Sequence, residues 1–444
     1  MIMAMANVAF AASLTGGEVG GFTSVDTPTS QDKTITIKKE LTVYNVDEAT
    51  INAQTMSYTY ALTAGTADIN VTDDTADHAN STAVTVKTKA GVTPTFVVMT
   101  GQGQTTGTAT IAWASTETVT ASTGGTANYK TLTLDFSSVV FGAAGVYRYV
   151  LTETPATYAA AGVTETDNTT NPHVRYLDVY VRPAPTGFTD GNAAADWDIY
   201  GYVCMVESEE ITPSGDSTTT GAVKTDGFVS GSNDSTAYTA DSYFTYNVTV
   251  SKTVTNDSYA KATHAFPFTV MFTNATITQP VDISSSTTGT TGGFTDPASA
   301  ALSTGTTNGI VTIKDSSSVK YIGIPNGTQV EVYETNDVTG VTYHVTTTTD
   351  GTANVDAAVT DGTTPTSAVS QTTRAAYQST KTTITPTANA DDDTAHTIAV
   401  DNNLQVISPT GVTLRVAPYI LMLAAGIVLI VLVKTRRKAA VEED

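Results

Sequence analysis

Cysteine is almost absent from this chain of 444 residues, in which Cys204 is the only one. A single cysteine excludes a disulfide bond within the chain, so a secreted protein of this size must be stabilised by other means. Cys204 lies in an apolar segment with the alternation of a strand, residues 197–206, and we interpret it as a small buried core residue.

Positive charge is also scarce. The chain has 43 Asp and Glu against 21 Lys and Arg, so its formal charge is −22, and charged residues of both signs amount to only 14%. An acidic surface repels the phosphates of nucleic acids, which excludes DNA and RNA as partners. The same surface suits a protein that is secreted and faces solvent.

Long segments with the periodicity of a helix are missing as well, and so are the motifs of metal and cofactor sites. Before the C-terminal tail, short alternating segments are joined by polar turns and by Thr-, Gly- and Ser-rich runs such as 284–309 and 348–373, which we interpret as loops. The five histidines lack the paired spacing of a zinc site, and neither a phosphate loop nor a nucleophile elbow occurs. We predict an all-β protein of two or three domains, with no metal or cofactor, that is not an enzyme.

The N-terminal residues have the character of a targeting segment. Residues 1–11 are apolar and end in Ala9-Phe10-Ala11, the small-any-small pattern of a signal-peptidase site. Because a basic leader is missing, we interpret them as the remnant of a signal peptide. Residues 12–32 are rich in Gly, Ser and Thr and are expected to form a lead-in linker.

The C-terminal segment, 407–444, combines three features. A pentapeptide ends in Pro409, Thr410 and Gly411, an unbroken apolar run follows at 417–433, and a basic cluster closes the run. The run has about the shortest length that crosses a bilayer, so we expect a transmembrane helix, and the basic cluster would keep the tail in the cytoplasm. In this order the three features resemble the sorting signal of Gram-positive surface proteins.

The resemblance implies that a sortase, a membrane transpeptidase, cleaves between Thr410 and Gly411 and joins the threonine to an amine. The commonest signal has one residue between proline and threonine. Their direct adjacency here is a departure that also occurs among pilus shaft proteins.

Two segments of domain size, 33–240 and 241–406, repeat one arrangement of strands. Successive side chains of a strand point to opposite faces, so residues of one parity share a face. Lys39 falls on the apolar face of the opening strand of the first segment, and Lys252 has the same place in the second. A lysine in the middle of an apolar face is costly unless it is paired or neutralised.

Later strands place further polar groups on apolar faces. Glu153 ends an alternating segment of the first copy, and Glu334 ends a shorter counterpart in the second. The last strand of the second copy, 398–402, has Asn402 on the face of its apolar residues. We therefore expect Lys252, Glu334 and Asn402 to meet in one core.

Such a trio has a definite chemistry. Burial disfavours charge, so Lys252 should lose its proton and become a nucleophile while Glu334 keeps one. Held beside the amide carbon of Asn402, the amine would displace ammonia with Glu334 as proton donor, and an isopeptide bond would form. The alternative is that Lys252 and Glu334 form only a buried ion pair.

Both copies resemble the isopeptide-linkage domains of Gram-positive pilus shaft proteins, through their lysine strands and the segment that ends at Glu153. The resemblance implies tandem immunoglobulin-like β-sandwiches, each with a bond from a lysine of its first strand to an asparagine of its last. In the first copy the lysine is Lys39, but aligning 224–230 with the family's last strand puts Ser230 at the reactive position. Either the nearby Asn233 is used, or this bond is absent.

The resemblance further implies a structural pilus shaft subunit, secreted and bound to the cell wall of a Gram-positive bacterium. A sortase would polymerise it through Thr410 and a lysine of the next copy. Position makes Lys224 the candidate, and an ordinary exposed lysine explains Lys224 equally well. Expected partners are the sortase, further copies of this chain and peptidoglycan, with minor pilins and host surface ligands as additional candidates. The alternative function is a monomeric wall-anchored adhesin that binds a host protein or glycan.

Overall fold

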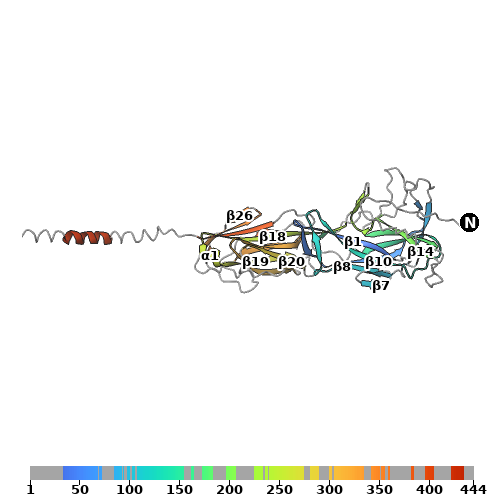
Figure 1. Ribbon diagram of the computed structural model, residues 1–444, viewed down its shortest axis with the longest axis horizontal. Helices are drawn as coiled ribbons and strands as arrows, with labels where there is room; N and C mark the ends of the chain where they lie inside the picture. Colours follow the sequence, from blue (N-terminus) through green and yellow to red (C-terminus); the bar gives the residue numbers. More distant parts are fainter. Residues whose placement is uncertain are drawn as a thin grey trace, which may run out of the picture.

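The computed structural model shows an elongated, almost entirely β protein in which two sandwiches lie end to end (Figure 1). The structure describes residues 34–68, 70–72, 85–92, 94, 98–100, 103–105, 108–154, 162–164, 173–183, 197–206, 225–233, 236–238, 240–274, 281–289, 300–302, 305–334, 342–350, 352–355, 359–360, 382–384, 396–404 and 422–434.

The first sandwich is built from two sheets. In one of them, β1 (Thr34–Tyr44) pairs antiparallel with β10 (Thr126–Asp135) and parallel with the short β15 (Gly227–Phe228). The other sheet has the order β14 (Trp197–Met205), β13 (Val174–Pro183), β11 (Gly145–Thr154), β3 (Met56–Ala64), β8 (Thr108–Trp113), β7 (Gly103–Thr105). The inward side chains of both sheets form one hydrophobic core. Cys204 is buried in this core, which confirms its interpretation as a core residue.

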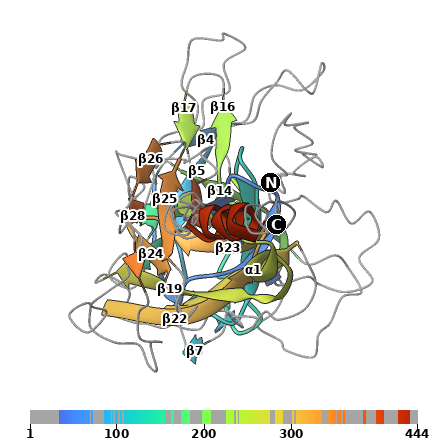
Figure 2. The ribbon, with the colours of Figure 1, turned by 90° about the vertical axis from the view of Figure 1, so that its left-hand side faces the viewer.

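The second sandwich also has two sheets and a hydrophobic core of its own. One sheet contains β20 (Val281–Thr288), β23 (Ser317–Pro325), β18 (Asp241–Thr255), β29 (His396–Leu404) and β25 (Thr342–Thr349). The other has the order β22 (Gly305–Lys314), β19 (Ala265–Asn274), β24 (Gln329–Glu334), β28 (Thr382–Ile384). Figure 2 looks along the rod from this end and shows β19 and β22 below β23.

The strand β18 belongs to both sandwiches. Its residues 241–244 pair in parallel with residues 41–44 of β1, in the first sandwich. Farther along, it pairs antiparallel with β23 and parallel with β29, in the second sandwich. The expected domain boundary at residue 241 therefore falls at the start of a single strand of 15 residues that joins the two bodies without a linker.

A pair of buried asparagines connects the sandwiches at their junction. Asn45 Nδ2 donates to Asn247 Oδ1 at 2.9 Å, and Asn247 Nδ2 donates to Asn45 Oδ1 at 2.8 Å. Beside them, Ile51 of β2 (Ala49–Asn52) packs against Gly323, where an added Cβ would lie 2.9 Å from the isoleucine side chain. The junction is thus both packed and hydrogen-bonded.

Two runs that the sequence indicated as loops contain strands. The run 284–309 includes most of β20, all of β21 (Ala300–Leu302) and the start of β22, and the run 348–373 includes the end of β25, β26 (Thr352–Val355) and β27 (Val359–Thr360). The loop interpretation was wrong at these positions. Threonine is well accepted in strands, but exposed residues such as those at 286–288 give the sequence no apolar alternation to detect.

Among the described residues, two helices lie outside the sheets. The short α1 (Ser258–Thr263) follows β18, and a second helix covers 422–434, where side chains such as Leu423 and Ile430 are exposed. The expected transmembrane segment, 417–433, is described only from residue 422 onward. Within the described parts of the chain, neither helix has the combined length and apolar character needed to cross a bilayer.

Candidate cross-linking sites

The structure brings Lys252, Glu334 and Asn402 together in the second core. Lys252 Nζ lies 3.1 Å from Glu334 Oε2, and Asn402 Nδ2 donates to Glu334 Oε1 at 2.6 Å. Relative exposures of 1%, 0% and 0% show that all three side chains are shielded from water. The glutamate therefore holds the amine and the carboxamide on its two oxygens, with the lysine and asparagine in neighbouring positions.

Strand pairing explains this arrangement. Lys252 is on β18 and Asn402 is on β29, and the two strands run parallel with Val254, two residues after the lysine, directly opposite Asn402. Glu334 comes from the facing sheet, where it ends β24 opposite Phe268 of β19. Three strands thus bring the polar groups to one point between the sheets.

The surroundings of Lys252 disfavour its charged form. Burial lowers the pKa of Lys252, and the nearby Glu334 carboxylate only partly opposes this effect. The ammonium nitrogen lies 4.6 Å from the centre of the Phe266 ring, and it donates to the carbonyl of Thr253 at 3.1 Å. A lysine with a lowered pKa supplies a larger fraction of neutral amine, the form that acts as a nucleophile.

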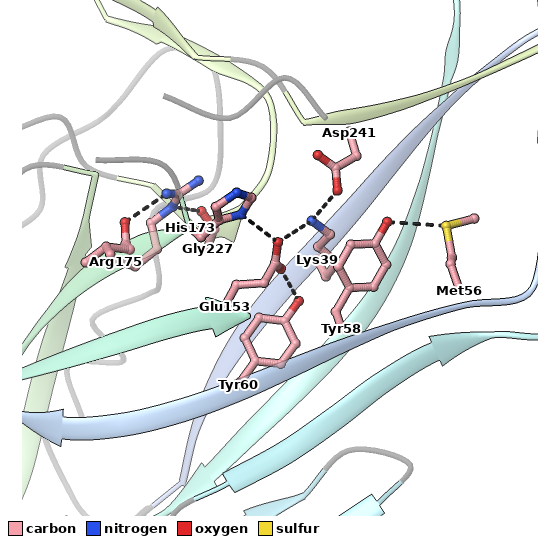
Figure 3. A network of polar contacts seen from close by, with 10 residues as sticks. Lys39, Met56, Tyr58, Tyr60, Glu153, His173, Arg175, Gly227 and Asp241 are labelled. Atoms are coloured by element: carbon pink, nitrogen blue, oxygen red, sulfur yellow. Dashed lines mark hydrogen bonds and ion pairs between the residues drawn. The ribbon is translucent and has the colours of Figure 1, made fainter. Parts of the chain in front are cut away.

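A second buried lysine site lies in the first sandwich (Figure 3). Lys39 Nζ is 3.1 Å from Glu153 Oε1 and 2.8 Å from Asp241 Oδ2. The three side chains come from β1, β11 and the first residue of β18, and their exposures are 3%, 1% and 2%. Lys39 is therefore enclosed between two carboxylates in a core that excludes water.

Asp241 has the same place in the first sandwich as Asn402 has in the second. In the first, Leu41, two residues after Lys39, is directly opposite Asp241 on a parallel strand. In the second, the residue two after Lys252 is opposite Asn402 in the same way. The register thus identifies Asp241 as the counterpart of Asn402.

Asp241 is not evident from the sequence because the chain makes an excursion just before it. Phe228 of β15 is opposite Lys39, so the alignment is correct up to this residue. The chain then leaves β1 as the hairpin of β16 (Gly231–Asn233) and β17 (Thr236–Tyr238), and it returns at Asp241. A continuous alignment has no means of skipping this hairpin.

Ser230 and Asn233, the two residues considered at the reactive position, are placed differently. Ser230 Oγ donates to Glu40 Oε1 at 2.9 Å, and Glu40 is on the face of β1 opposite to Lys39. This contact also explains why Glu40 is buried on the face of β1 that points away from Lys39. Asn233 is the last residue of β16, and its side chain lies outside the described residues.

Glu153 has two further partners that the sequence did not indicate. Tyr60 OH donates to Glu153 Oε2 at 2.5 Å, and His173 Nδ1 lies 3.4 Å from Glu153 Oε1. The backbone N–H of Glu153 donates to the carbonyl of His173 at 2.7 Å, and His173 has a left-handed φ of 66°. A non-glycine residue rarely adopts this conformation without a local requirement.

The charges of the first site influence each other. Burial lowers the pKa of Lys39, but attraction to Glu153 and Asp241 outweighs burial, so the net pKa is raised. For Asp241, burial together with the nearby Glu153 raises the pKa despite the lysine. For Glu153, burial is outweighed by Lys39 and by the hydrogen bonds from His173 and Tyr60, which lower the pKa. Asp241 is therefore the carboxyl that takes up a proton more readily.

The remaining residues singled out in the sequence lie outside the described part of the chain. They are the candidate acceptor Lys224 and the cleavage motif Pro409, Thr410 and Gly411. Their roles stay predictions.

Comparisons with other proteins cover different parts of the chain. Residues 246–372, within the second sandwich, match a family described as a domain of unknown function, DUF7601. No match was found among curated proteins.

Solved structures of Gram-positive surface proteins are similar to a larger part of the chain. The major pilin from Streptococcus pyogenes has 17% identity, with 83% of this chain and 98% of that chain covered and a TM-score of 0.38. The T3.2 major pilin from the same organism has 16% identity, with 84% and 100% covered and a TM-score of 0.36. A bacterial adhesin from Mobiluncus mulieris containing intramolecular disulfide, isopeptide and ester bond cross-links has 15% identity, with 85% and 100% covered and a TM-score of 0.22. Because these TM-scores are low, we infer function from the side chains of this chain alone.

Proposed function

We propose that this chain is a structural subunit of a cell-surface fibre of the pilus type, and that its second sandwich closes itself with a Lys252–Asn402 isopeptide bond. The observation that carries the proposal is that Lys252 and Asn402 both contact Glu334, in a core without access to water. An ion pair alone would need no carboxamide on the second oxygen of the glutamate.

The reaction needs only these three side chains. The Lys252 ammonium gives a proton to Glu334, and the neutral amine attacks the side-chain carbonyl carbon of Asn402. Glu334 then gives this proton to the nitrogen of the Asn402 amide, which leaves as ammonia, and takes up the second proton of the lysine nitrogen, so the new C–N bond is an amide. The strands bring the amine and the carboxamide to the same carboxylate before the reaction, so no bimolecular encounter is required.

The bond would serve a mechanical purpose. It joins β18 to β29, the first and last strands of the second sandwich, and closes a loop of roughly 150 residues, which by the chain-entropy model stabilises the fold by about 4 to 5 kcal/mol. Under tension, force on the two strands would pass through a covalent bond instead of separating the hydrogen-bonded sheet. This is the property that a fibre subunit without disulfides requires.

Assembly is proposed to proceed through the C-terminal signal. A sortase would cleave between Thr410 and Gly411 and join Thr410 to a lysine of the next copy, with Lys224 as the candidate, and the finished fibre would be attached to peptidoglycan. The apolar run at 417–433 would hold the precursor in the membrane until cleavage. The same interpretation of the C-terminal signal implies that the protein is secreted to the surface of a Gram-positive bacterium.

Two measurements test the proposal. Peptide mapping of the folded chain should find Lys252 and Asn402 in one branched peptide with a deficit of about 17 Da for the lost ammonia; separate linear peptides would contradict the bond. Coexpression with a pilin sortase should give SDS-resistant multimers that Lys224→Ala abolishes. A single wall-attached species without multimers would instead support the monomeric adhesin.

A further inference from the structure

We propose that Lys39 and Asp241 also condense to an isopeptide bond, in a reaction that releases water instead of ammonia. The inference extends the proposed function to the first sandwich, and it can fail while the Lys252–Asn402 bond stands. It rests on the contact at 2.8 Å between Lys39 Nζ and Asp241 Oδ2 in a buried site.

The position of Asp241 distinguishes this contact from an ordinary ion pair. Asp241 and Asn402 have the same register relative to their lysines, and each lysine also meets a glutamate from the facing sheet. The two buried sites thus repeat one strand register. Asp241 has the backbone position relative to Lys39 that Asn402 has relative to Lys252, and its carboxylate is in direct contact with the lysine.

The aromatic side chains beside the two sites differ: the first site has tyrosines at positions where the second has phenylalanines. Tyr60 is opposite Glu153 in the first sandwich, and Phe268 is at the matching position opposite Glu334 in the second. Two residues earlier, the ring beneath the lysine is Tyr58 in the first site and Phe266 in the second.

An asparagine brings no charge, and the second site has phenylalanines opposite Glu334 and beneath Lys252. Asp241 adds a second carboxylate to a core with one lysine, and the first site also contains polar side chains that bind the other carboxylate, Glu153. Tyr60 donates to Glu153, and His173 lies beside the same carboxylate. The exchange of asparagine for aspartate is thus accompanied by a change in the surrounding side chains, as expected if both sites perform a reaction with different electrophiles.

The step is balanced without any external reagent. The Lys39 ammonium transfers a proton to the Glu153 carboxylate, and the neutral amine attacks the protonated carboxyl group of Asp241. Glu153 gives this proton to the hydroxyl group of the tetrahedral intermediate, which leaves as water, and then takes up the second proton of the attacking nitrogen, so the products are one amide, one water molecule and a protonated Glu153. Expulsion of this water from an apolar core opposes the reverse reaction.

Tyr60 and His173 act as positioning residues in this reaction. Tyr60 binds the Glu153 oxygen that does not contact Lys39, which leaves the other oxygen directed at the amine. His173 fixes Glu153 through its side chain and through its backbone carbonyl. Both contacts orient the group that moves protons.

Peptide mapping of the natively folded full chain tests the bond directly. We expect a branched peptide that contains Lys39 and Asp241, with a deficit of about 18 Da for the lost water. Linear Lys39 peptides beside an intact Lys252–Asn402 branch would overturn this inference and leave the proposed function standing. A branch from Lys39 to Asn233 would overturn it as well. Loss of the Lys252–Asn402 branch alone would refute only the proposed bond of the second sandwich.

Variants give an independent check. Asp241→Asn should still form the bond, now with loss of ammonia, and its branched peptide should have the same mass as that of the unmodified chain because the amide product is identical. Asp241→Ala and Lys39→Arg should give only linear peptides at this site. Asn402→Ala is the matched control, because it removes the second bond and should leave the Lys39–Asp241 branch unchanged.

The positioning residues need a kinetic test. Full chain recovered unfolded and unlinked from inclusion bodies is refolded, and the branched peptide is quantified over time at several pH values. Tyr60→Phe should form the same bond at least about tenfold more slowly, with a shifted pH profile, because Glu153 loses a charge-assisted hydrogen bond. An unchanged rate and profile would show that Tyr60 has no such role.

Discussion

Asp241 and Lys252 lie on one strand, β18, but their side chains enter the cores of different sandwiches. The strand runs from the partner of Lys39 to the partner of Asn402 with no linker between them. With both bonds formed, a covalent path leads from Lys39 through Asp241 and Lys252 to Asn402. Tension along the rod would follow this path and leave most of each sandwich outside it.

The first prediction concerns mechanical unfolding. When the protein is pulled by handles beside Thr34 and Leu404, the unmodified chain should show no unfolding step, because both sandwiches are bypassed. Asp241→Ala should add a step of roughly 70 nm, from a separation of 202 residues between Lys39 and Asp241. Asn402→Ala should add a step of roughly 50 nm for about 150 residues. Force spectroscopy separates the two lengths, and steps in the unmodified chain would contradict the covalent path.

The second prediction concerns Glu334. Glu334→Gln keeps the shape of the side chain but removes its ability to accept the lysine proton, so we expect no Lys252–Asn402 branch. The second sandwich should lose about 4 to 5 kcal/mol of unfolding free energy with its crosslink. Denaturant unfolding and peptide mapping of the same sample measure both effects. Asn403→Ala, next to Asn402 on β29, is the control and should keep the branch.

The third prediction is that the two bonds respond oppositely to pH. Burial lowers the pKa of Lys252, and acid converts its amine to the unreactive ammonium, so the Lys252–Asn402 rate should fall as the pH falls through that lowered pKa. Burial raises the pKa of Asp241, and a neutral carboxyl is a better electrophile than a carboxylate. The Lys39–Asp241 rate should therefore increase as the pH falls toward the raised pKa of Asp241.

Both rates are measured in one refolding series by quantifying the two branched peptides. Asp241→Asn supplies the control, because the first site then has a carboxamide and should lose its increase in acid. Parallel pH profiles for the two bonds in the unmodified chain would show that the carboxyl group of Asp241 is not the electrophile.

The sequence alone predicts the position of a site residue when that position depends only on strand parity. Lys252, Glu334 and Asn402 each follow alternating apolar residues, and this alternation was enough to place them in one core. Asp241 could not be found in this way, because its position depends on a hairpin that returns the chain to β1 after an excursion. The register of such a return is set by pairing between distant strands, which local periodicity does not contain.

Some contacts of the first site were beyond sequence reasoning for a different reason. Tyr60 lies in the alternating segment 56–62, where an aromatic residue indicates only a buried face, and the pairing opposite Glu153 is what gives its hydroxyl group a partner. His173 follows a part of the chain without periodicity and reaches Glu153 through a left-handed backbone. With the two copies aligned, Tyr60 falls at the position of Phe268, and this difference is the signal in the sequence that the two sites have different polar surroundings.

The last prediction concerns the junction between the sandwiches. The buried amide of Gly323 donates to Asn247 Oδ1 at 3.1 Å, in addition to the reciprocal bonds between Asn247 and Asn45. Asn247→Ala leaves this amide without its acceptor, at a cost of about 1 to 3 kcal/mol. Hydrogen exchange of the Gly323 amide should then be about tenfold faster or more, since 1.4 kcal/mol corresponds to about a factor of ten. Asn45→Ala keeps the acceptor on Asn247 and should accelerate the exchange of the Gly323 amide less. Equal exchange rates in the two variants would show that the hydrogen bond from Gly323 does not stabilise the junction.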